Sequence, residues 1–538
     1  MKRKILYSCL SLVVILAMTL FAVPVRTSFS EDMEDSCTSM AAGKLATKDK
    51  SVLFGHNEDD GGNVVQRLHL VPRIYHYPGE TIEMWDINVP DGGGAKATIP
   101  QVVGETWAYF WSEMPNMQFA DSYFNEWGVA IASDACGSRE TRPYDLTNGG
   151  IGYWVRRLVA ERAKTAREGV EIIGKAVETY GYASSGRTYT IADPNEAWLC
   201  QVVAGRHWVA QRVPDDEVAF IPNRYTIHEV NLADTKNFLG SPDLIDYAIS
   251  KGWYNPATDG EFDFAKAYGN YTGSDIRQRG GWRLLTGIEY SSTDRAPFSA
   301  KPKELLTVKA ITDVLRTHYE GTPDDQTKYP INPSTSYPLG DPHHTGLRVI
   351  CTASTQESFV MQLRSNIPPH IGNVYWRTQG RPCESVYVPL YLGMLEFPTP
   401  YTVGDPSNYS KLPLSDRYYD PDSAYWVFNH METLVDLDYL VKQPMVRSFW
   451  DDVEATEFAL QGEIEKTAHK MYKGKNYHGE DRYFADWFLT RYSQSLALDA
   501  YYKALGFIEE FEPQQRATGG ESYSPPVALS IKILYVLV

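Results

Sequence analysis

Alternating apolar and polar residues indicate several short β-strands in the first half of the chain. Between 38 and 57, short apolar stretches are separated by turn residues such as Gly, Lys and Asp, which predicts a β-hairpin. A second hairpin is predicted where 188–192 and 197–203 flank an Asp-Pro-Asn turn. Further strands are expected at 128–133 and 217–221. These segments predict sheets built largely from antiparallel neighbours.

Two consecutive helices are predicted between these strands. Apolar residues from Tyr153 onward recur at helical spacing. Thr165 and Glu168 have the spacing of a capping box, and Gly181 follows the last apolar position, so a second helix is expected between them. Later elements are expected as a helix near 305–318, strands near 348–363 and 385–391, and helices over most of 416–508.

The order of these elements predicts the fold class. Strands, then two helices, then strands again are typical of a layered α+β protein, here a four-layer αββα sandwich. The chain shows neither an internal repeat nor a clear linker. We therefore expect one large catalytic domain over 37–415 and a mostly helical C-terminal portion over 416–538 that packs on it.

The first residues are typical of a targeting segment. Three basic residues at positions 2–4 precede an uncharged, mostly apolar stretch over 5–25. We expect 1–30 to be a signal peptide or a membrane anchor, because the apolar stretch is also long enough to cross a bilayer. Residues 31–36 are then a short, acidic propeptide. The protein is predicted to be exported to the periplasm, the cell surface or the medium.

Charge and cysteine content narrow the function classes. The net charge of −17 and the lack of a basic, aromatic-rich run argue against a nucleic-acid partner. Cysteines stand at 9, 37, 136, 200, 351 and 383, without the close spacing of a zinc motif. We expect no metal and no cofactor. Apart from Cys37 and the leader's Cys9, the cysteines are expected to be core residues or disulfide partners.

Cys37 is the candidate nucleophile. It follows the acidic leader and precedes a hairpin that ends in Gly55-His-Asn-Glu-Asp59. Cleavage before Cys37 would place a thiol and a free α-amino group on one residue. The pKa of such an amine is about 7.7–8.0, so roughly a tenth of it is neutral at pH 7 and can act as a base. An N-terminal cysteine can therefore supply both nucleophile and base.

Several motifs, taken in order, resemble one family. They are Cys37-Thr-Ser, Gly55-His-Asn-Glu-Asp59, Asn125-Glu-Trp-Gly-Val-Ala130, Tyr182-Ala-Ser-Ser-Gly186, Ile191-Ala-Asp-Pro-Asn-Glu-Ala-Trp198 and His318-Tyr-Glu-Gly-Thr322. Together they resemble the dipeptidase A family of cysteine peptidases, relatives of the secernins within the N-terminal nucleophile hydrolases. The likeness extends from 37 to about 400. It implies an αββα core, cysteine at the mature N-terminus, and hydrolysis of dipeptides without a metal.

The resemblance also implies roles for three residues. Cys37 matches the nucleophile. Asp59 falls where related enzymes keep an aspartate near the nucleophile's amine, and Asn223 resembles the asparagine that donates to the oxyanion. Two structural alternatives stay open: Asp59 could cap a turn beside the following glycines, and Asn223 could be a turn residue at a strand end.

Substrate contacts are less well defined. His56 departs from the arginine that many relatives have there, and we assign His56 and Asn57 to the substrate-binding rim. The candidates for a further site arginine are Arg277, Arg279 and Arg283. Other charged residues are expected to be solvated, namely Glu58 and Asp60 beside the motif and Arg156 and Arg157 on the first predicted helix.

The combined hypothesis is an exported cysteine dipeptidase that acts on small peptides. One alternative is an N-acyl amidase of the penicillin V acylase or bile salt hydrolase type, which uses the same N-terminal cysteine. A second alternative is a non-catalytic binding protein on the same fold. The N-terminal segment could serve as a transient membrane anchor, and the sequence leaves the oligomeric state open.

Overall fold

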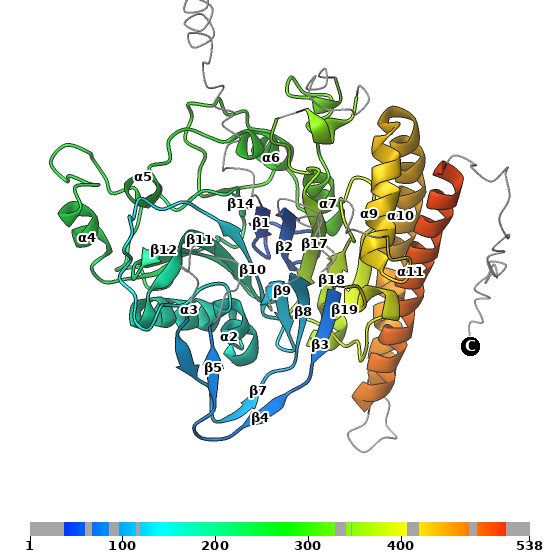
Figure 1. The fold of residues 1–538 in the computed structure, drawn as a ribbon, viewed down its shortest axis with the longest axis horizontal. Coiled ribbons are helices and arrows are strands. Elements are labelled where there is room, and N and C mark those ends of the chain that lie inside the picture. Colours follow the sequence, from blue (N-terminus) through cyan, green and yellow to red (C-terminus); the bar gives the residue numbers. More distant parts are fainter. Residues whose placement is uncertain are drawn as a thin grey trace, which may run out of the picture.

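The computed structural model describes eight stretches of the chain (Figure 1). They are 37–59, 67–84, 96–114, 119–328, 340–345, 347–405, 419–472 and 481–512. The predicted leader, the propeptide and Asp60 lie outside these described residues. Among the described helices, none combines the length and the apolar character that a membrane span requires.

A seven-stranded sheet carries the predicted nucleophile hairpin. Its strands are antiparallel, and β1 pairs with β2 so that Thr38 lies opposite Asn57. The predicted hairpin over 38–57 is therefore confirmed, and Cys37 immediately precedes its first strand. In spatial order the strands are β16 (Ser299–Ala300), β14 (Val218–Ile221), β1 (Thr38–Ala42), β2 (Val52–Asp59), β17 (Thr355–Leu363), β18 (Val374–Arg377) and β19 (Val388–Tyr391).

An eight-stranded sheet packs face to face against the first one. The second predicted hairpin forms its centre, because β11 and β12 pair across the Asp-Pro-Asn turn. In spatial order the strands are β15 (Phe238–Gly240), β13 (Trp208–Arg212), β12 (Ala197–Gly205), β11 (Tyr182–Ala192), β10 (Ala130–Ala135), β9 (Phe119–Asn125), β8 (Tyr109–Met114) and β3 (Arg67–Val71). Two small two-stranded sheets accompany it, formed by β4 (Ile74–His76) with β7 (Gly104–Thr106) and by β5 (Thr81–Glu83) with β6 (Thr98–Pro100).

Helices cover the outer faces of both sheets. α2 (Val155–Arg162) and α3 (Ala166–Tyr180) lie on the eight-stranded sheet, and α6 (Ile276–Thr286) and α7 (Val308–Leu315) lie on the seven-stranded sheet (Figure 1). The result is the predicted αββα sandwich. Shorter helices occupy the connections: α4 (Leu244–Ser250), α5 (Phe264–Gly269) and α8 (Pro369–Gly372).

Local sequence explains where these helices begin and how closely they pack. The Thr165 hydroxyl accepts a hydrogen bond from the Glu168 N–H at the start of α3, and Gly181 ends that helix with a φ of 78°, as predicted. Gly55 lets α7 approach β2, because a Cβ at this position would lie 2.5 Å from Ile311 Cγ2. A side chain there would push the helix away from the sheet.

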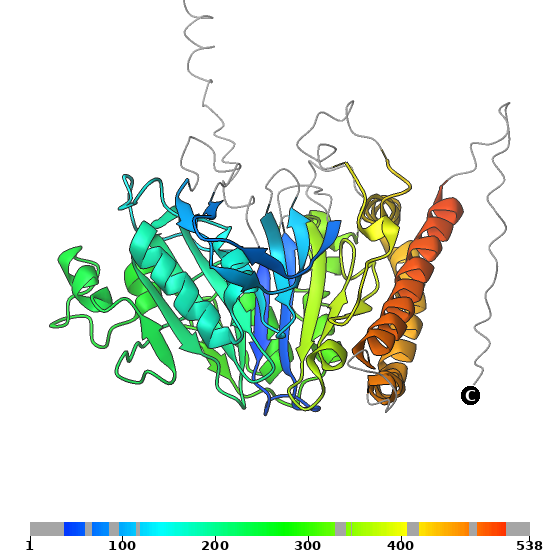
Figure 2. The same ribbon diagram turned by 90° about the horizontal axis from the view of Figure 1, so that it is seen from below.

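Three long helices form the C-terminal portion. α9 (Ala424–Asp436), α10 (Tyr439–Tyr472) and α11 (Asp481–Phe511) pack against one another, and α11 contacts β19 at the edge of the seven-stranded sheet. Figure 2 shows these helices, coloured gold to red, at one side of the two sheets. Their apolar residues join the main core, in which Trp450 and Leu489 are buried together with Trp376 of β18. The helices predicted over most of 416–508 are therefore confirmed, and the division of the chain into domains stays a prediction.

Candidate active site

Cys37 lies buried at the start of β1, across the hairpin from Glu58. Its thiol donates a hydrogen bond of 3.1 Å to Glu58 Oε2, and only 3% of the cysteine is exposed. Successive residues of a strand point to opposite faces, so positions 56 and 58 of β2 both face the interior of the sandwich. Glu58 is 5% exposed. The expectation that Glu58 is solvated is therefore wrong.

His56 links Cys37's hairpin to the eight-stranded sheet. Its Nδ1 lies 2.7 Å from Ser39 Oγ, and the Ser39 hydroxyl donates a hydrogen bond of 2.6 Å to Asp134 on β10. Since the hydroxyl has one proton and gives it to Asp134, its oxygen accepts from His56 Nδ1. On the other side of the ring, His56 Nε2 lies 3.4 Å from Glu58 and 3.3 Å from Asp121 of β9.

The carboxylates around His56 control its charge. Burial opposes protonation, but the charge of Asp121 and its hydrogen bond outweigh burial and raise the pKa of His56 well above its usual value. The charged imidazole in turn lowers the pKa of Asp121 in spite of that residue's burial. Burial raises the pKa of Asp134 to about 6, and His56 limits the rise. The interior of the site therefore holds a charged imidazolium among acidic groups at neutral pH.

The thiol of Cys37 is protonated in the intact chain. Burial raises its pKa well above the usual value, and the negative charge of Glu58 adds to the effect. Burial, together with the charge of Asp121, also raises the pKa of Glu58. A carboxylate with a raised pKa is a stronger proton acceptor. In its ionised form, Glu58 is therefore placed to receive the proton of the Cys37 thiol.

Arg156 supports this cluster from α2. Its Nη1 donates to the main-chain oxygen of Asp121 at 2.5 Å and lies 3.5 Å from Asp121 Oδ1. The arginine is 1% exposed. The expectation that Arg156 is solvated is wrong, because α2 turns this residue toward β9 rather than outward. It holds the carboxylate that raises the pKa of His56.

Arg277 connects the nucleophile with Asn223. Arg277 Nη1 donates to the carbonyl oxygen of Cys37 and to Asn223 Oδ1, both at 2.8 Å. The other two candidate arginines have different partners, since Arg279 donates to Ser274 O and Arg283 pairs with Glu289. The structure therefore singles out Arg277 among the three candidates.

The amide of Asn223 is oriented by this contact. Because Arg277 holds Oδ1, the Nδ2 group must point the other way. Asn223 Nδ2 is buried and has no hydrogen-bond partner among the described residues. Leaving a buried donor without a partner costs about 1–3 kcal/mol of folding free energy. The Asn223 amide, which Arg277 links to Cys37, is therefore suited to stabilise negative charge that develops on a substrate.

Asp59 and Asn57 lie on the opposite face of β2, toward the α7 layer. Asp59 accepts hydrogen bonds of 2.5 Å from Thr355 Oγ1 and from Arg348 Nη2. Burial raises the pKa of Asp59, and both partners limit the rise. Asn57 donates from Nδ2 to the carbonyl oxygens of Leu315 and Ile350. This geometry favours a structural role for Asn57. A role of Asp59 at the amine of Cys37 stays a prediction.

The position of His56 also differs from the prediction, which placed this residue on the substrate-binding rim. It is fully buried and contacts Ser39, Glu58 and Asp121, so it supports the nucleophile from the interior. Alternate residues of a strand share one face, so the pattern could have placed Ser39 beside Cys37 and Glu58 beside His56 on the inner face of the hairpin. No local signal marks Asp121 and Asp134, which come from the other sheet.

Three groups of side chains in the described part of the chain could hold a metal ion. One is Cys37 with His56 and Glu58 at the candidate active site. The other two share His343 and lie in a separate cluster, described below. The described cysteines at 37, 136, 200, 351 and 383 are all buried and free, so none of them forms a disulfide in this structure.

Comparison with known proteins identifies the family. The model of peptidase family C69 matches residues 36–452, which includes the whole site described above. The chain belongs to peptidase family C69. The resemblance predicted from the motifs is thereby confirmed, and the match begins one residue before Cys37.

Curated relatives in this family carry related descriptions. A "probable dipeptidase" of Salmonella dublin is 27% identical over 67% of this chain and 82% of its own length. A "probable dipeptidase" of Latilactobacillus sakei is 27% identical over 75% of this chain and 82% of its own length. A "probable dipeptidase B" of Streptococcus pyogenes serotype M1 is 25% identical over 78% of this chain and 82% of its own length.

Several solved structures also match this chain. A mutant of conjugated bile acid hydrolase from Clostridium perfringens has a TM-score of 0.26 and 12% identity, over 64% of this chain and 89% of that chain. A Caenorhabditis elegans ortholog of N-acylethanolamine-hydrolyzing acid amidase has a TM-score of 0.24 and 13% identity. The match covers 60% of this chain and 92% of that chain.

Proposed function

We propose that this C69 peptidase is an exported cysteine dipeptidase whose nucleophile, Cys37, becomes N-terminal by cleavage of the peptide bond before it. One observation carries the proposal: Arg277 binds both the Cys37 carbonyl and Asn223, and so orients a buried amide donor that has no partner among the described residues. The curated relatives described as probable dipeptidases support the substrate class.

In the proposed reaction, the free α-amino group of Cys37 accepts the thiol proton. The thiolate attacks the carbonyl carbon of the dipeptide, and the carbonyl oxygen becomes an oxyanion that Asn223 Nδ2 and a backbone N–H stabilise. The C–N bond then breaks, and the leaving amine takes the proton back from the α-ammonium group. Water hydrolyses the resulting thioester and restores the free thiol.

Maturation is proposed to use the same nucleophile. In the intact chain the α-nitrogen of Cys37 belongs to a peptide bond and cannot act as the base. Glu58 accepts the thiol's hydrogen bond there and has a raised pKa, because it is buried near Asp121. We assign Glu58 as the proton acceptor when the Cys37 thiol attacks the carbonyl of the preceding residue. The C–N bond breaks as its nitrogen takes that proton back from Glu58 and becomes the free amine. Hydrolysis of the resulting thioester then releases the leader.

Export is part of the proposal and rests on the sequence alone. The basic residues at 2–4 and the uncharged stretch over 5–25 are typical of a secretion signal. The cleavage before Cys37 would remove both that segment and the acidic residues 31–36.

The experiment compares kcat/KM for an unblocked dipeptide, its N-acetyl form, its C-terminal amide and penicillin V. A dipeptidase recognises a free ammonium group and a free carboxylate, and capping either end leaves a charged partner in the site unpaired. We expect the unblocked dipeptide to be preferred by about 10² or more. The Cys37→Ala variant is the control and should show no turnover. Faster hydrolysis of the acetylated peptide or of penicillin V would reject the dipeptidase in favour of an amidase.

A further inference from the structure

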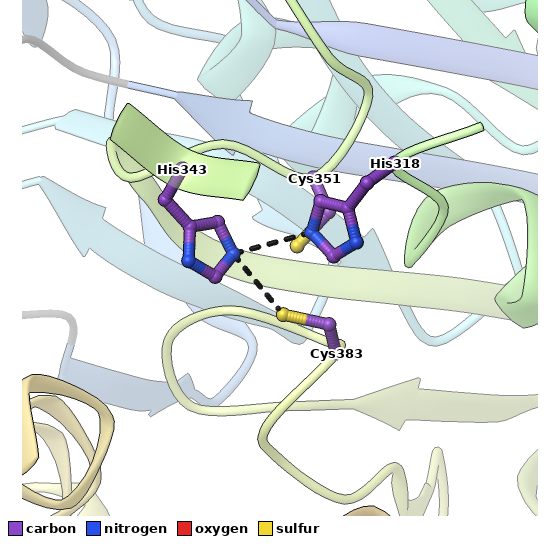
Figure 3. Close-up of side chains that lie close together, drawn as sticks. All are labelled: His318, His343, Cys351 and Cys383. Carbon is purple, nitrogen blue, oxygen red and sulfur yellow. Dashed lines mark hydrogen bonds between the residues drawn. The ribbon is translucent and has the colours of Figure 1, made fainter. Parts of the chain in front are cut away.

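A second buried cluster lies beyond α7, apart from the proposed nucleophile. His318, His343, Cys351 and Cys383 place one nitrogen or sulfur atom each within 4.8 Å of one another, and all four residues are buried. Figure 3 shows the two imidazoles and the two thiols converging on one point. His343 Nε2 lies 3.2 Å from His318 Nε2 and 3.3 Å from Cys383 Sγ.

Carboxylates hold the far side of both imidazole rings. His318 Nδ1 lies 2.7 Å from Glu320 Oε1. His343 Nδ1 lies 3.1 Å from Asp436 and 3.2 Å from Asp341. An ionised carboxylate only accepts hydrogen bonds, so Glu320 favours a proton on Nδ1 of His318. At Nδ1 of His343, Asp436 and Asp341 favour a proton in the same way, against the single donor Arg381 Nη1 at 3.2 Å. Metal-binding histidines are typically oriented in this way by a carboxylate behind the ring.

The two Nε2 atoms therefore face each other with their lone pairs. Two lone pairs 3.2 Å apart repel each other unless a proton or a metal ion lies between them. Arg381 does not supply a proton there, because its Nη1 lies on the Nδ1 side of His343 at 3.2 Å and pairs there with Asp436 at 2.7 Å. The centre of the cluster therefore suits an electron-pair acceptor, such as a metal ion, between the four ligand atoms.

We propose that His318, His343, Cys351 and Cys383 bind one Zn²⁺ ion in a structural site. Two nitrogen and two thiolate ligands are a common donor set for structural zinc. Zinc bonds of about 2.0–2.1 Å to nitrogen and 2.3 Å to sulfur place the ligand atoms of a tetrahedron roughly 3.3–3.8 Å apart, which the observed spacings approach. Two thiolates also neutralise the charge of the ion within a buried region.

A zinc ion here would join four segments that are distant in sequence. His318 follows α7, His343 lies in a short helix over Pro342–His344, Cys351 precedes β17, and Cys383 lies between β18 and β19. This explains why the sequence shows no compact zinc motif. With four protein ligands and no exposed position, the site is structural, and peptide hydrolysis remains the task of Cys37.

The site would also stabilise the outer face of β2. Cys351 follows Ile350, whose carbonyl accepts a hydrogen bond from Asn57, and the same segment carries Arg348, which pairs with Asp59. His318 lies three residues beyond Leu315, the second acceptor of the Asn57 amide. The ion would thus fix two loops that support the strand carrying Glu58.

The test measures zinc in the full chain, purified from zinc-supplemented medium, by elemental mass spectrometry. The proposal predicts one zinc ion per chain, and loss of that ion in Cys351→Ala and in Cys383→Ala. Two matched variants should keep it. Cys200→Ala removes a buried thiol from the eight-stranded sheet, and Cys37→Ala removes the cysteine of the other candidate metal group.

A spectroscopic measurement covers the case in which the cluster variants fail to fold. The Cys37→Ala protein, grown with Co²⁺ in place of Zn²⁺, should show thiolate-to-cobalt charge-transfer bands and the intense visible bands of tetrahedral cobalt. Three results would overturn the proposal: protein without bound zinc or cobalt, a Cys351–Cys383 disulfide in the isolated chain, or an ion that is lost in Cys37→Ala and kept in Cys351→Ala.

Discussion

Asn223 is the residue whose chemistry the structure defines most sharply. Its carbonyl oxygen is held by Arg277, so its NH₂ group has a fixed direction and no partner among the described residues. Such an oriented donor needs no reorganisation when negative charge develops, which is the basis of oxyanion stabilisation.

Replacing Asn223 by Ala should lower kcat by about 10² to 10³, because one preorganised oxyanion donor is lost. The measurement is kcat for an unblocked dipeptide, with circular dichroism to verify the fold. Asn231→Ala is the control, since Asn231 is exposed, and its kcat should match that of the wild type. A decrease in kcat below tenfold for Asn223→Ala would show that Asn223 is a structural turn residue and not an oxyanion donor.

Glu58→Gln should slow maturation by about 10² or more, because glutamine cannot accept the proton of the Cys37 thiol. The measurement is the fraction of chains that begin at Cys37, followed over time by intact-protein mass spectrometry. Glu83→Gln, an exposed change on β5, should mature at the normal rate. Normal maturation of the Glu58→Gln chain would assign the proton transfer to another group.

Capping residues determine how firmly the short helices are held. Asp263 is the N-cap of α5 and accepts from the Lys266 N–H, and it also contacts His228 and Arg295. Burial opposes ionisation of Asp263, but the hydrogen bond from His228 and the other partners outweigh burial and lower the pKa to about 2. Asp243 is the N-cap residue of α4, but its side chain makes no capping hydrogen bond.

Replacing Asp263 by Ala should lower the free energy of unfolding by about 1–2 kcal/mol at pH 7. A lowered carboxyl pKa stabilises the folded state above the unfolded pKa of about 3.9, and this contribution is lost as the pH falls toward 2. The difference between the variant and the wild type should therefore shrink below pH 4. Urea unfolding at several pH values measures it, with Asp243→Ala as the control. A constant difference from pH 7 to pH 3 would contradict the assigned pKa.

The C-terminal helices and the sheets are joined by buried charges as well as by apolar packing. Arg364, which follows β17, donates to both oxygens of Glu465 on α10, at 2.9 and 2.5 Å. Each side chain is 8% exposed. Removing one partner leaves a buried charge unpaired, and that cost commonly exceeds the net value of the pair.

Arg364→Ala should destabilise the chain by about 3–5 kcal/mol, and Arg364→Met with Glu465→Met should cost markedly less. Urea unfolding followed by tryptophan fluorescence and by circular dichroism measures both variants, and the two signals should change together if the helices and sheets unfold as one unit. Lys309→Ala breaks an exposed pair with Asp313 and should cost below about 1 kcal/mol. A separate early transition of the helices would show that the C-terminal portion is an independent domain.

Most elements of the fold could be predicted from local patterns. The hairpin after Cys37, the Thr165 cap, the β11–β12 turn and the C-terminal helices depend on residues that are neighbours in sequence. Period, capping and turn chemistry act over a few residues, so they can be recognised without the fold. The placement of Cys37 after an acidic leader indicated the nucleophile, and the ordered motifs indicated the family.

The partners of Cys37 could not be predicted in the same way. Glu58 was expected in solvent, yet the second sheet covers it. Asp121 reaches His56, and Asp134 reaches Ser39, only because the two sheets pack face to face. The selection of Arg277 depends on how α6 is rotated over the seven-stranded sheet. The cluster around His343 gathers residues from four segments. Such contacts arise from the packing of surfaces far apart in sequence, and no local pattern records which surfaces will meet.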